Sequence, residues 1–193
     1  MHQEKLFIPI LLGTVRQGRA SENVAKLIYE RVKAHQEIET KLFDPKDMDL
    51  PMNDEGQELK VKNPDYRDAI IKSDGLIIVT PEYNHGYPGS LKRALDILLR
   101  EYAHKAVGIC GVSSGGFGGV RAVEMLLNVV RELGLTAIST DLYFPKAGEL
   151  FDKDGELLDE SYNDRIDDFL EELIWMAKAL RYGRNNISSK FNH

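Results

Sequence analysis

The chain has 193 residues, 25 Lys and Arg against 31 Asp and Glu, a formal net charge of −6 at pH 7, and a hydrophobic fraction of 42%. This length and composition exclude disordered and collagenous chains, and no apolar run is long enough to cross a bilayer. The mild acidic excess argues against a nucleic-acid partner, and a single cysteine, Cys110, suits a reducing compartment. We therefore expect a soluble, cytoplasmic protein with no nucleic-acid or membrane partner.

Short apolar runs alternate with amphipathic helical patterns along most of the chain. The runs predict five strands, at residues 6–12, 38–43, 75–80, 106–112 and 136–142. The amphipathic patterns predict helices at residues 21–34, 66–72, 90–98, 120–133 and 165–181. Because Pro9 cannot donate a ladder hydrogen bond, we expect it near the beginning of the first strand.

This alternation predicts an α/β fold with a parallel sheet and helices on both faces, because right-handed crossovers leave few other arrangements. We expect one domain over residues 1–182 and a poorly packed polar tail over 183–193. Two long polar segments, 44–63 and 144–164, interrupt the pattern. Long loops inside a compact domain are often functional or contact another subunit.

Ligands of open α/β sheets bind outside the carboxyl ends of the strands, where the strand order reverses. The loop after the first strand, residues 13–23, combines hydroxyls, arginines and backbone amides before a helix N-terminus, which suits a phosphate. Arg16 would add charge-assisted hydrogen bonds. The plain alternative is a connecting loop in which Ser21 caps the helix. The loop matches neither the Walker A nor the Gly-x-Gly-x-x-Gly pattern.

The loops after the third and fourth strands suit a flat ligand. In residues 80–90, prolines and glycines shape the backbone, and Tyr83 would pack on a planar ring. The alternative is a rigid connection with incidental aromatics, in which His85 is a surface residue. Residues 113–119 contain four glycines, which let the backbone approach a ligand closely, although a flexible connector is the alternative.

Other chemical motifs are absent from the sequence pattern. No His, Cys and carboxylate spacing predicts a metal site. Residues 152–156 resemble part of a calcium loop but lack its later ligands, so we expect a turn at Asp154-Gly155 instead. Cys110 lies inside an apolar strand and is expected to be a buried thiol rather than a nucleophile.

Taken together, four motifs resemble the NADPH-dependent FMN reductase family, which includes quinone, azo-dye and chromate reductases. They are Gly13-Thr14-x-Arg16, Ser21-x-Asn23, Pro81-Glu82-Tyr83-Asn84 and Ser113-x-Gly115-x-x-Gly118-Gly119. The similarity covers residues 7–180, and the Pro-Glu-Tyr-Asn tetrapeptide is its most specific part. It implies a flavodoxin-like fold, a doubly wound five-stranded parallel sheet in the order 2-1-3-4-5. The loop between Arg16 and Ser21 is longer here than in many members.

The resemblance implies FMN as the cofactor and NAD(P)H as the reductant, with no catalytic side chain and no metal. The FMN phosphate would be held by Thr14, Arg16, Ser21 and Asn23. The ribityl chain and isoalloxazine would be lined by Pro81, Glu82, Tyr83 and Asn84. The other edge of the ring would be covered by Ser113, Gly115 and Gly116.

The implied activity is hydride transfer from NAD(P)H to bound FMN and then to a quinone, azo compound, metal or free flavin. Two alternatives stay open, a flavodoxin-like electron carrier and a non-catalytic FMN redox sensor. Such carriers usually lack arginine in the phosphate loop and are more acidic than −6. The family implies a homodimer or homotetramer, to which Tyr87 and Phe117 are candidate contributors. The choice between NADH and NADPH stays open, and basic residues such as Arg19 are only a hint of NADPH.

Overall fold

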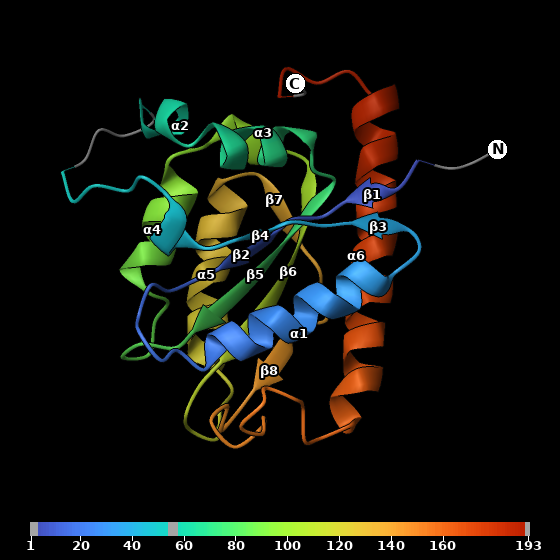
Figure 1. The fold of residues 1–193 in the computed structure, drawn as a ribbon. Coiled ribbons are helices and arrows are strands. Elements are labelled where there is room, and N and C mark those ends of the chain that lie inside the picture. Colours follow the sequence, from blue (N-terminus) through green and yellow to red (C-terminus); the bar gives the residue numbers. More distant parts are fainter. Residues whose placement is uncertain (1–3, 54–57, 192–193) are drawn as a thin grey trace.

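Parallel strands rich in Val, Ile and Leu form the centre of the molecule (Figure 1). The computed structural model describes residues 4–53 and 58–191. Its main sheet has the order β4-β2-β5-β6-β7, with β8 also pairing with β6, and a second two-stranded sheet joins β1 to β3. The bounds are β1 Leu6–Phe7, β2 Ile10–Leu12, β3 Ile38–Glu39, β4 Leu42–Phe43, β5 Gly75–Pro81, β6 Lys105–Val112, β7 Leu135–Ala137 and β8 Leu142–Phe144.

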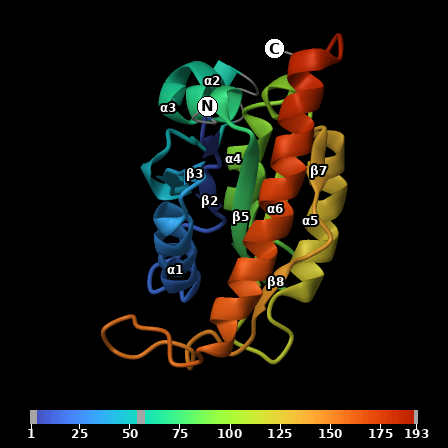
Figure 2. The same cartoon turned by 90° about the vertical axis from the view of Figure 1, so that its right-hand side faces the viewer.

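Helices cover both faces of this sheet, so the predicted α/β class is confirmed. The helices are α1 Ser21–Ala34, α2 Leu59–Lys62, α3 Pro64–Lys72, α4 Gly89–Asp96, α5 Val120–Glu132 and α6 Ser161–Asn186, with single 3₁₀ turns η1 Pro45–Asp47 and η3 Arg100–Tyr102. One apolar core lies under α1 and α6, and a second lies under α3, α4 and α5. In the view of Figure 2, α6 runs in front of the strands, with α1 to its left and α5 to its right. Among the described residues, no helix has the length and apolar character that crossing a bilayer requires.

The first predicted strand, residues 6–12, is divided into β1 and β2, and Pro9 lies directly before the first residue of β2, the part that belongs to the main sheet. The N–H groups of Ile8 and Ile10 still donate to the neighbouring chain segment, each at 2.9 Å, and the Pro9 carbonyl accepts from Ile77 at 2.9 Å. The Pro9 carbonyl therefore takes part in the sheet. The hydrogen bond that is missing at this position is the one that a backbone N–H would donate, which proline lacks.

The second and fifth predicted strands are also divided. Residues 38–43 form β3 and β4, and residues 136–142 form β7 and the first residue of β8. β7 pairs with residues 105–107 and β8 with residues 110–112, so both lie along the same strand, β6. The intervening residues 139–141 leave the ladder, and Ser139 and Asp141 are residue types that favour turns over strands.

The last helix, α6, is longer than predicted and includes residues 183–186 of the expected tail. Arg184 explains this difference, because its guanidinium donates to Asp74 Oδ1 at 2.7 Å and to the His104 carbonyl at 2.6 Å. Arg181 also pairs with Asp74. The end of α6 is therefore held to the start of the sheet by ion pairs, which an apolar periodicity does not reveal.

Candidate functional site

Three loops meet at the carboxyl edge of the sheet, toward the lower left of Figure 1. The N–H of Gly13 donates to the Val79 carbonyl at 2.8 Å, and Ser90 Oγ donates to the Gly13 carbonyl at 3.2 Å. The N–H of Glu82 donates to the Val112 carbonyl at 2.9 Å. These bonds connect the loops after β2, β5 and β6, which are the three loops that the sequence singled out.

The loop after β2 ends in an uncapped helix N-terminus. Ala20 is the N-cap residue of α1 and has no capping side chain, so the alternative in which Ser21 is the N-cap is wrong. Ser21 is the first helical residue, and its buried Oγ has no hydrogen-bond partner. A buried hydroxyl without a partner costs free energy, so this atom is suited to a ligand oxygen. Asn23, half-buried, lies in the same first turn.

Tyr83, from the loop after β5, lies against the loop after β2. Its hydroxyl is 2.8 Å from Thr14 Oγ1, and the Arg16 guanidinium stacks 3.9 Å from the centre of its ring. Thr14 is buried, and its hydroxyl also accepts from the Arg16 N–H at 3.3 Å. The structure thus brings three predicted site residues from two loops into direct contact.

Arg19 anchors the same loop from inside. Its buried guanidinium donates to Asp44 Oδ1 at 3.1 Å and to the Thr14 carbonyl, and its Nε lies 3.5 Å from Glu22. Burial raises the pKa of Asp44, but the Lys46 N–H and then Arg19 outweigh it, so the pKa lies below its ordinary value. Because this buried arginine is already paired with Asp44, it has no free charge to offer to a dinucleotide phosphate.

The turn within the Pro-Glu-Tyr-Asn loop is tight and reciprocal. The Tyr83 N–H donates to the Gly86 carbonyl at 2.8 Å, and the Gly86 N–H returns a bond of 3.0 Å. Asn84 and His85 occupy its two central positions with left-handed φ values of 51° and 67°. This pair of angles is typical of a type I′ turn, which holds the exposed Asn84 in one orientation. Pro81 ends β5 directly before this loop.

The carboxylate of Glu82 is engaged by a residue that the sequence analysis missed. It accepts from Arg121 Nη1 at 2.9 Å and from the Arg121 N–H at 3.3 Å, and the Glu82 side chain is 8% exposed. The guanidinium of Arg121 in turn lies 4.6 Å from the ring centre of Phe117. The signal in the sequence that could have identified Arg121 was its position just after the glycine loop, at the start of the next helix.

The glycines of the loop after β6 serve two purposes. Gly118 and Gly119 have φ values of 65° and 88°, and a Cβ at Gly119 would lie 2.6 Å from the Val112 nitrogen. These two positions therefore require glycine for packing. A Cβ at Gly115 or Gly116 would meet nothing within 4 Å, so these two border open space that a ligand can approach.

The segment after β8 completes this edge. Lys146 donates its N–H to the Gly115 carbonyl at 2.9 Å, and Ala147 donates to the Ser113 carbonyl at 2.9 Å. Ser113 Oγ donates to the Gly115 carbonyl at 2.9 Å. Further along, the predicted turn at Asp154-Gly155 is confirmed, with the Asp152 N–H donating to the Glu156 carbonyl at 2.9 Å.

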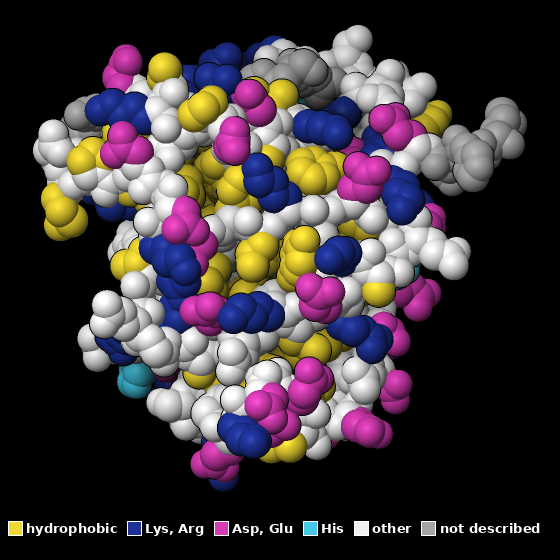
Figure 3. Space-filling view, in the orientation of Figure 1, with side chains coloured by type: hydrophobic (Ala, Val, Ile, Leu, Met, Phe, Trp, Pro, Cys, Tyr) yellow, Lys and Arg dark blue, Asp and Glu magenta, His cyan; other side chains and the backbone are white. Residues whose placement is uncertain are grey.

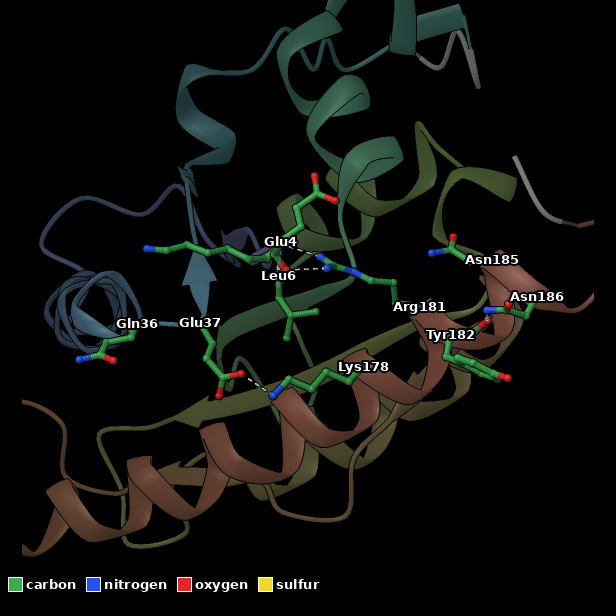
Figure 4. Close-up of a pocket in the computed structure, with 10 residues that line it drawn as sticks. Glu4, Leu6, Gln36, Glu37, Lys178, Arg181, Tyr182, Asn185 and Asn186 are labelled. Carbon is green, nitrogen blue, oxygen red and sulfur yellow. Dashed lines mark hydrogen bonds and ion pairs between the residues drawn. The ribbon is translucent and has the colours of Figure 1, made fainter. Parts of the chain in front are cut away.

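A cavity of about 290 Å³ lies at the opposite edge of the sheet, between the start of β1 and the second half of α6 (Figure 4). Glu37 pairs with Lys178 across it, and Arg181 donates to the carbonyls of Glu4 and Lys5. These groups satisfy one another, and no motif residue lines the cavity. Within residues 4–53 and 58–191, no group of three or more metal-ligating side chains is assembled.

Comparison with known proteins gives consistent matches. The family model for NADPH-dependent FMN reductase matches residues 8–149. A quinone reductase of Escherichia coli K12 is 30% identical over 167 residues, covering 78% of this chain and 87% of that protein. An NAD(P)H-dependent FMN reductase of Saccharomyces cerevisiae is 29% identical, covering 68% of this chain and 76% of that protein. The solved flavoenzyme NAD(P)H:(acceptor) oxidoreductase from Paracoccus denitrificans superposes with a TM-score of 0.74 at 23% identity, covering 90% and 98% of the two chains, which shows a shared fold.

Proposed function

The chain belongs to the NADPH-dependent FMN reductase family, and on that premise we propose that FMN binds where its three loops meet. The protein is an FMN-dependent NAD(P)H oxidoreductase of flavodoxin-like fold. One observation carries the placement of the cofactor. The buried hydroxyl of Ser21 has no protein partner and lies at the N-terminus of a 14-residue helix, where an anion is favoured.

The phosphate of FMN is assigned to the first loop. Ser21 supplies its free hydroxyl, Thr14 and Asn23 add polar groups, and the first turn of α1 supplies backbone N–H groups. Arg16 has no acidic partner among the described residues and supplies the charge. The donor set therefore fits a phosphate dianion at this edge.

The flavin ring is assigned to the other two loops. The type I′ turn presents Tyr83 and Asn84, and the open space beside Gly115 and Gly116 admits a flat ring. Pro81 is the last residue of β5, directly before the first of these loops, and Ser113 is the first residue of the second. The carboxylate of Glu82 is bound to Arg121, so its proposed contribution to the cofactor is through its backbone.

FMN, when bound, supplies the hydride chemistry. The chain's own residues bind the phosphate, orient the ring and leave one face open for NAD(P)H and then for the acceptor. Backbone N–H groups at the ring's polar edge stabilise negative charge there without a proton transfer. No side chain is assigned as a general acid or base, and His85, the histidine nearest these residues in the chain, is exposed.

The proposed acceptors are small molecules: quinones, azo compounds, oxidised metals or free flavin. The redox-sensor alternative requires negligible turnover with any acceptor, and the electron-carrier alternative requires that the isolated protein does not oxidise NAD(P)H directly. Steady-state oxidation of NAD(P)H by the FMN-loaded protein with a small quinone separates them. Rapid turnover supports the enzyme, and turnover only with a partner protein supports the carrier.

The cofactor placement is tested by Ser21→Ala. We expect the dissociation constant for FMN to rise about fivefold to tenfold, because one hydrogen bond to a charged phosphate is lost. Fluorescence titration of the apoprotein with FMN measures this change. Ser139→Ala, an exposed serine outside the three loops, is the matched control. Equal FMN affinities for the two variants would contradict the placement.

We also propose a homodimer or homotetramer in the cytoplasm. Phe117, 66% exposed beside the glycine loop, and the half-buried Tyr87 are suited to contact with a second copy. On the face shown in Figure 3, Lys and Arg side chains alternate with Asp and Glu, so this face has no broad basic area of the kind that binds nucleic acid.

The oligomer is tested by the mass of the protein in solution. Light scattering that gives a monomer mass would refute the oligomer.

A further inference from the structure

Lys146 has an unusual backbone at the rim of the proposed site. Its φ is 48°, in the left-handed region that a residue with a Cβ adopts at a free-energy cost. Its N–H donates to the Gly115 carbonyl at 2.9 Å, and its carbonyl accepts from the Glu149 N–H at 2.7 Å. These two hydrogen bonds hold the backbone of Lys146 beside the open space at Gly115 and Gly116, and its side chain is exposed there. Strained residues held in this way concentrate at functional sites.

The charges around this edge single out the same residue. On the loops after β2 and β8 and in the first turn of α5, the cations paired with an acid are Arg19, Lys153 and Arg121. The two cations there without an acidic partner, within the described part of the chain, are Arg16 and Lys146. Arg16 stacks on Tyr83 and is assigned to the FMN phosphate. Lys146 belongs to a different loop and is not needed for that phosphate.

We propose that Lys146 binds the 2′-phosphate of NADPH and so makes the enzyme select NADPH over NADH. The inference rests on the proposed function, since it requires the dinucleotide to enter at the open face by Gly115. The 2′-phosphate is the one group that distinguishes the two dinucleotides. An unpaired ammonium on a flexible stem at the rim binds that phosphate as a point charge.

The test compares Lys146→Asn with Lys153→Asn in the FMN-loaded protein. Asparagine tolerates a left-handed φ, so the first variant keeps its backbone. Lys153 has a side chain that is 90% exposed on the same long loop, which makes it the matched control. Isothermal titration with NADP⁺ and with NAD⁺ gives binding without turnover, and steady-state kinetics with a small quinone give KM for NADPH and NADH.

For Lys146→Asn we expect the Kd of NADP⁺ and the KM of NADPH to rise about tenfold, because a charge-assisted contact is lost. NAD⁺, NADH and FMN affinities should stay within about twofold, a change too small for a lost contact of this kind. Lys146→Arg should restore most of the NADP⁺ affinity.

An unchanged ratio of NADP⁺ to NAD⁺ affinity, or an equal effect in Lys153→Asn, would overturn the inference. Loss of FMN from Lys146→Asn would also overturn it, since it would place Lys146 in the cofactor site. Failure of the proposed function looks different: neither dinucleotide would be oxidised by any variant, the wild type included.

Discussion

Of the four buried side-chain polar atoms without a hydrogen-bond partner in the described part of the chain, Ser21 Oγ and Asp141 Oδ1 differ in what they imply. The first lies at the N-terminus of α1 among the motif residues, where a phosphate would satisfy it. The second lies in the break between β7 and β8. Burial raises the pKa of Asp141 to about 6, the Tyr143 hydroxyl at 3.1 Å partly opposes this, and Glu124 adds to it. We therefore expect the ionised Asp141 carboxylate to destabilise the folded protein at neutral pH.

The sign of this effect predicts how Asp141→Asn behaves. The pKa of Asp141 is about 6 in the folded protein and near 3.8 in the unfolded chain, so the folded state favours the protonated carboxyl. The free energy of unfolding of the wild type therefore falls as the pH rises from about 4 to 6. The variant should be more stable than wild type by about 1–2 kcal/mol at pH 8 and equal to it near pH 4. Urea unfolding at both pH values measures this, with the exposed Asp154→Asn as control. An equal gain at the two pH values would contradict the assignment.

We expect Arg16 to bind the phosphate of FMN and to contribute little to the stability of the fold. The side chain is exposed, and its recorded side-chain contact is the Tyr83 ring, so Arg16→Ala should change the free energy of unfolding by less than about 0.5 kcal/mol. The same substitution should raise the Kd of FMN at least about tenfold, because a charged hydrogen-bond donor is lost. Arg67→Ala, on α3 and paired with its neighbour Asp68, is the control. Unchanged FMN retention on gel filtration would remove Arg16 from the phosphate site.

At the scale of elements, Lys105 joins the first residue of β6 to the end of α3. Its buried ammonium donates to the carbonyls of Ile70, Ile71 and Ser73 at 2.7, 2.7 and 2.8 Å. These carbonyls lie at the C-terminus of α3, where the helix supplies few N–H donors, although the Ile70 carbonyl also accepts from the Ser73 N–H at 3.2 Å and from Ser73 Oγ at 2.8 Å. Lys105→Met should therefore cost about 2–3 kcal/mol of unfolding free energy, since it removes the buried donor that binds the Ile71 and Ser73 carbonyls and one of the donors to Ile70. The exposed Lys153→Met should be neutral in the same chemical denaturation, and equal midpoints would contradict the link.

Element positions follow well from local pattern, and long-range polar pairing does not. Apolar periodicity predicted α1 to the residue, because its inward stripe is complete. The breaks in three strands depend on which neighbour each peptide meets, which periodicity does not report. Likewise, the Glu82–Arg121 and Arg19–Asp44 pairs join residues 39 and 25 positions apart. The meeting of the three loops was predictable, because parallel strands place their carboxyl ends at one edge.

In the whole molecule, the two ends of the sheet have different tasks. At the amino edge, Asp74 binds Arg181 and Arg184 and holds α6 to the sheet. At the carboxyl edge, loops that are fixed to one another leave a free hydroxyl, an unpaired cation and open space beside glycines. This separation lets the carboxyl edge keep polar groups without partners while the opposite edge stabilises the fold.

The visible spectrum of the purified protein, before and after NADPH is added without oxygen, reports both flavin binding and reduction of the flavin by the dinucleotide. We expect a two-banded yellow flavin spectrum that bleaches within seconds, because FMN, when bound, accepts hydride directly from NADPH. A flavin spectrum that does not bleach, or a colourless protein that ignores added FMN, would contradict this expectation.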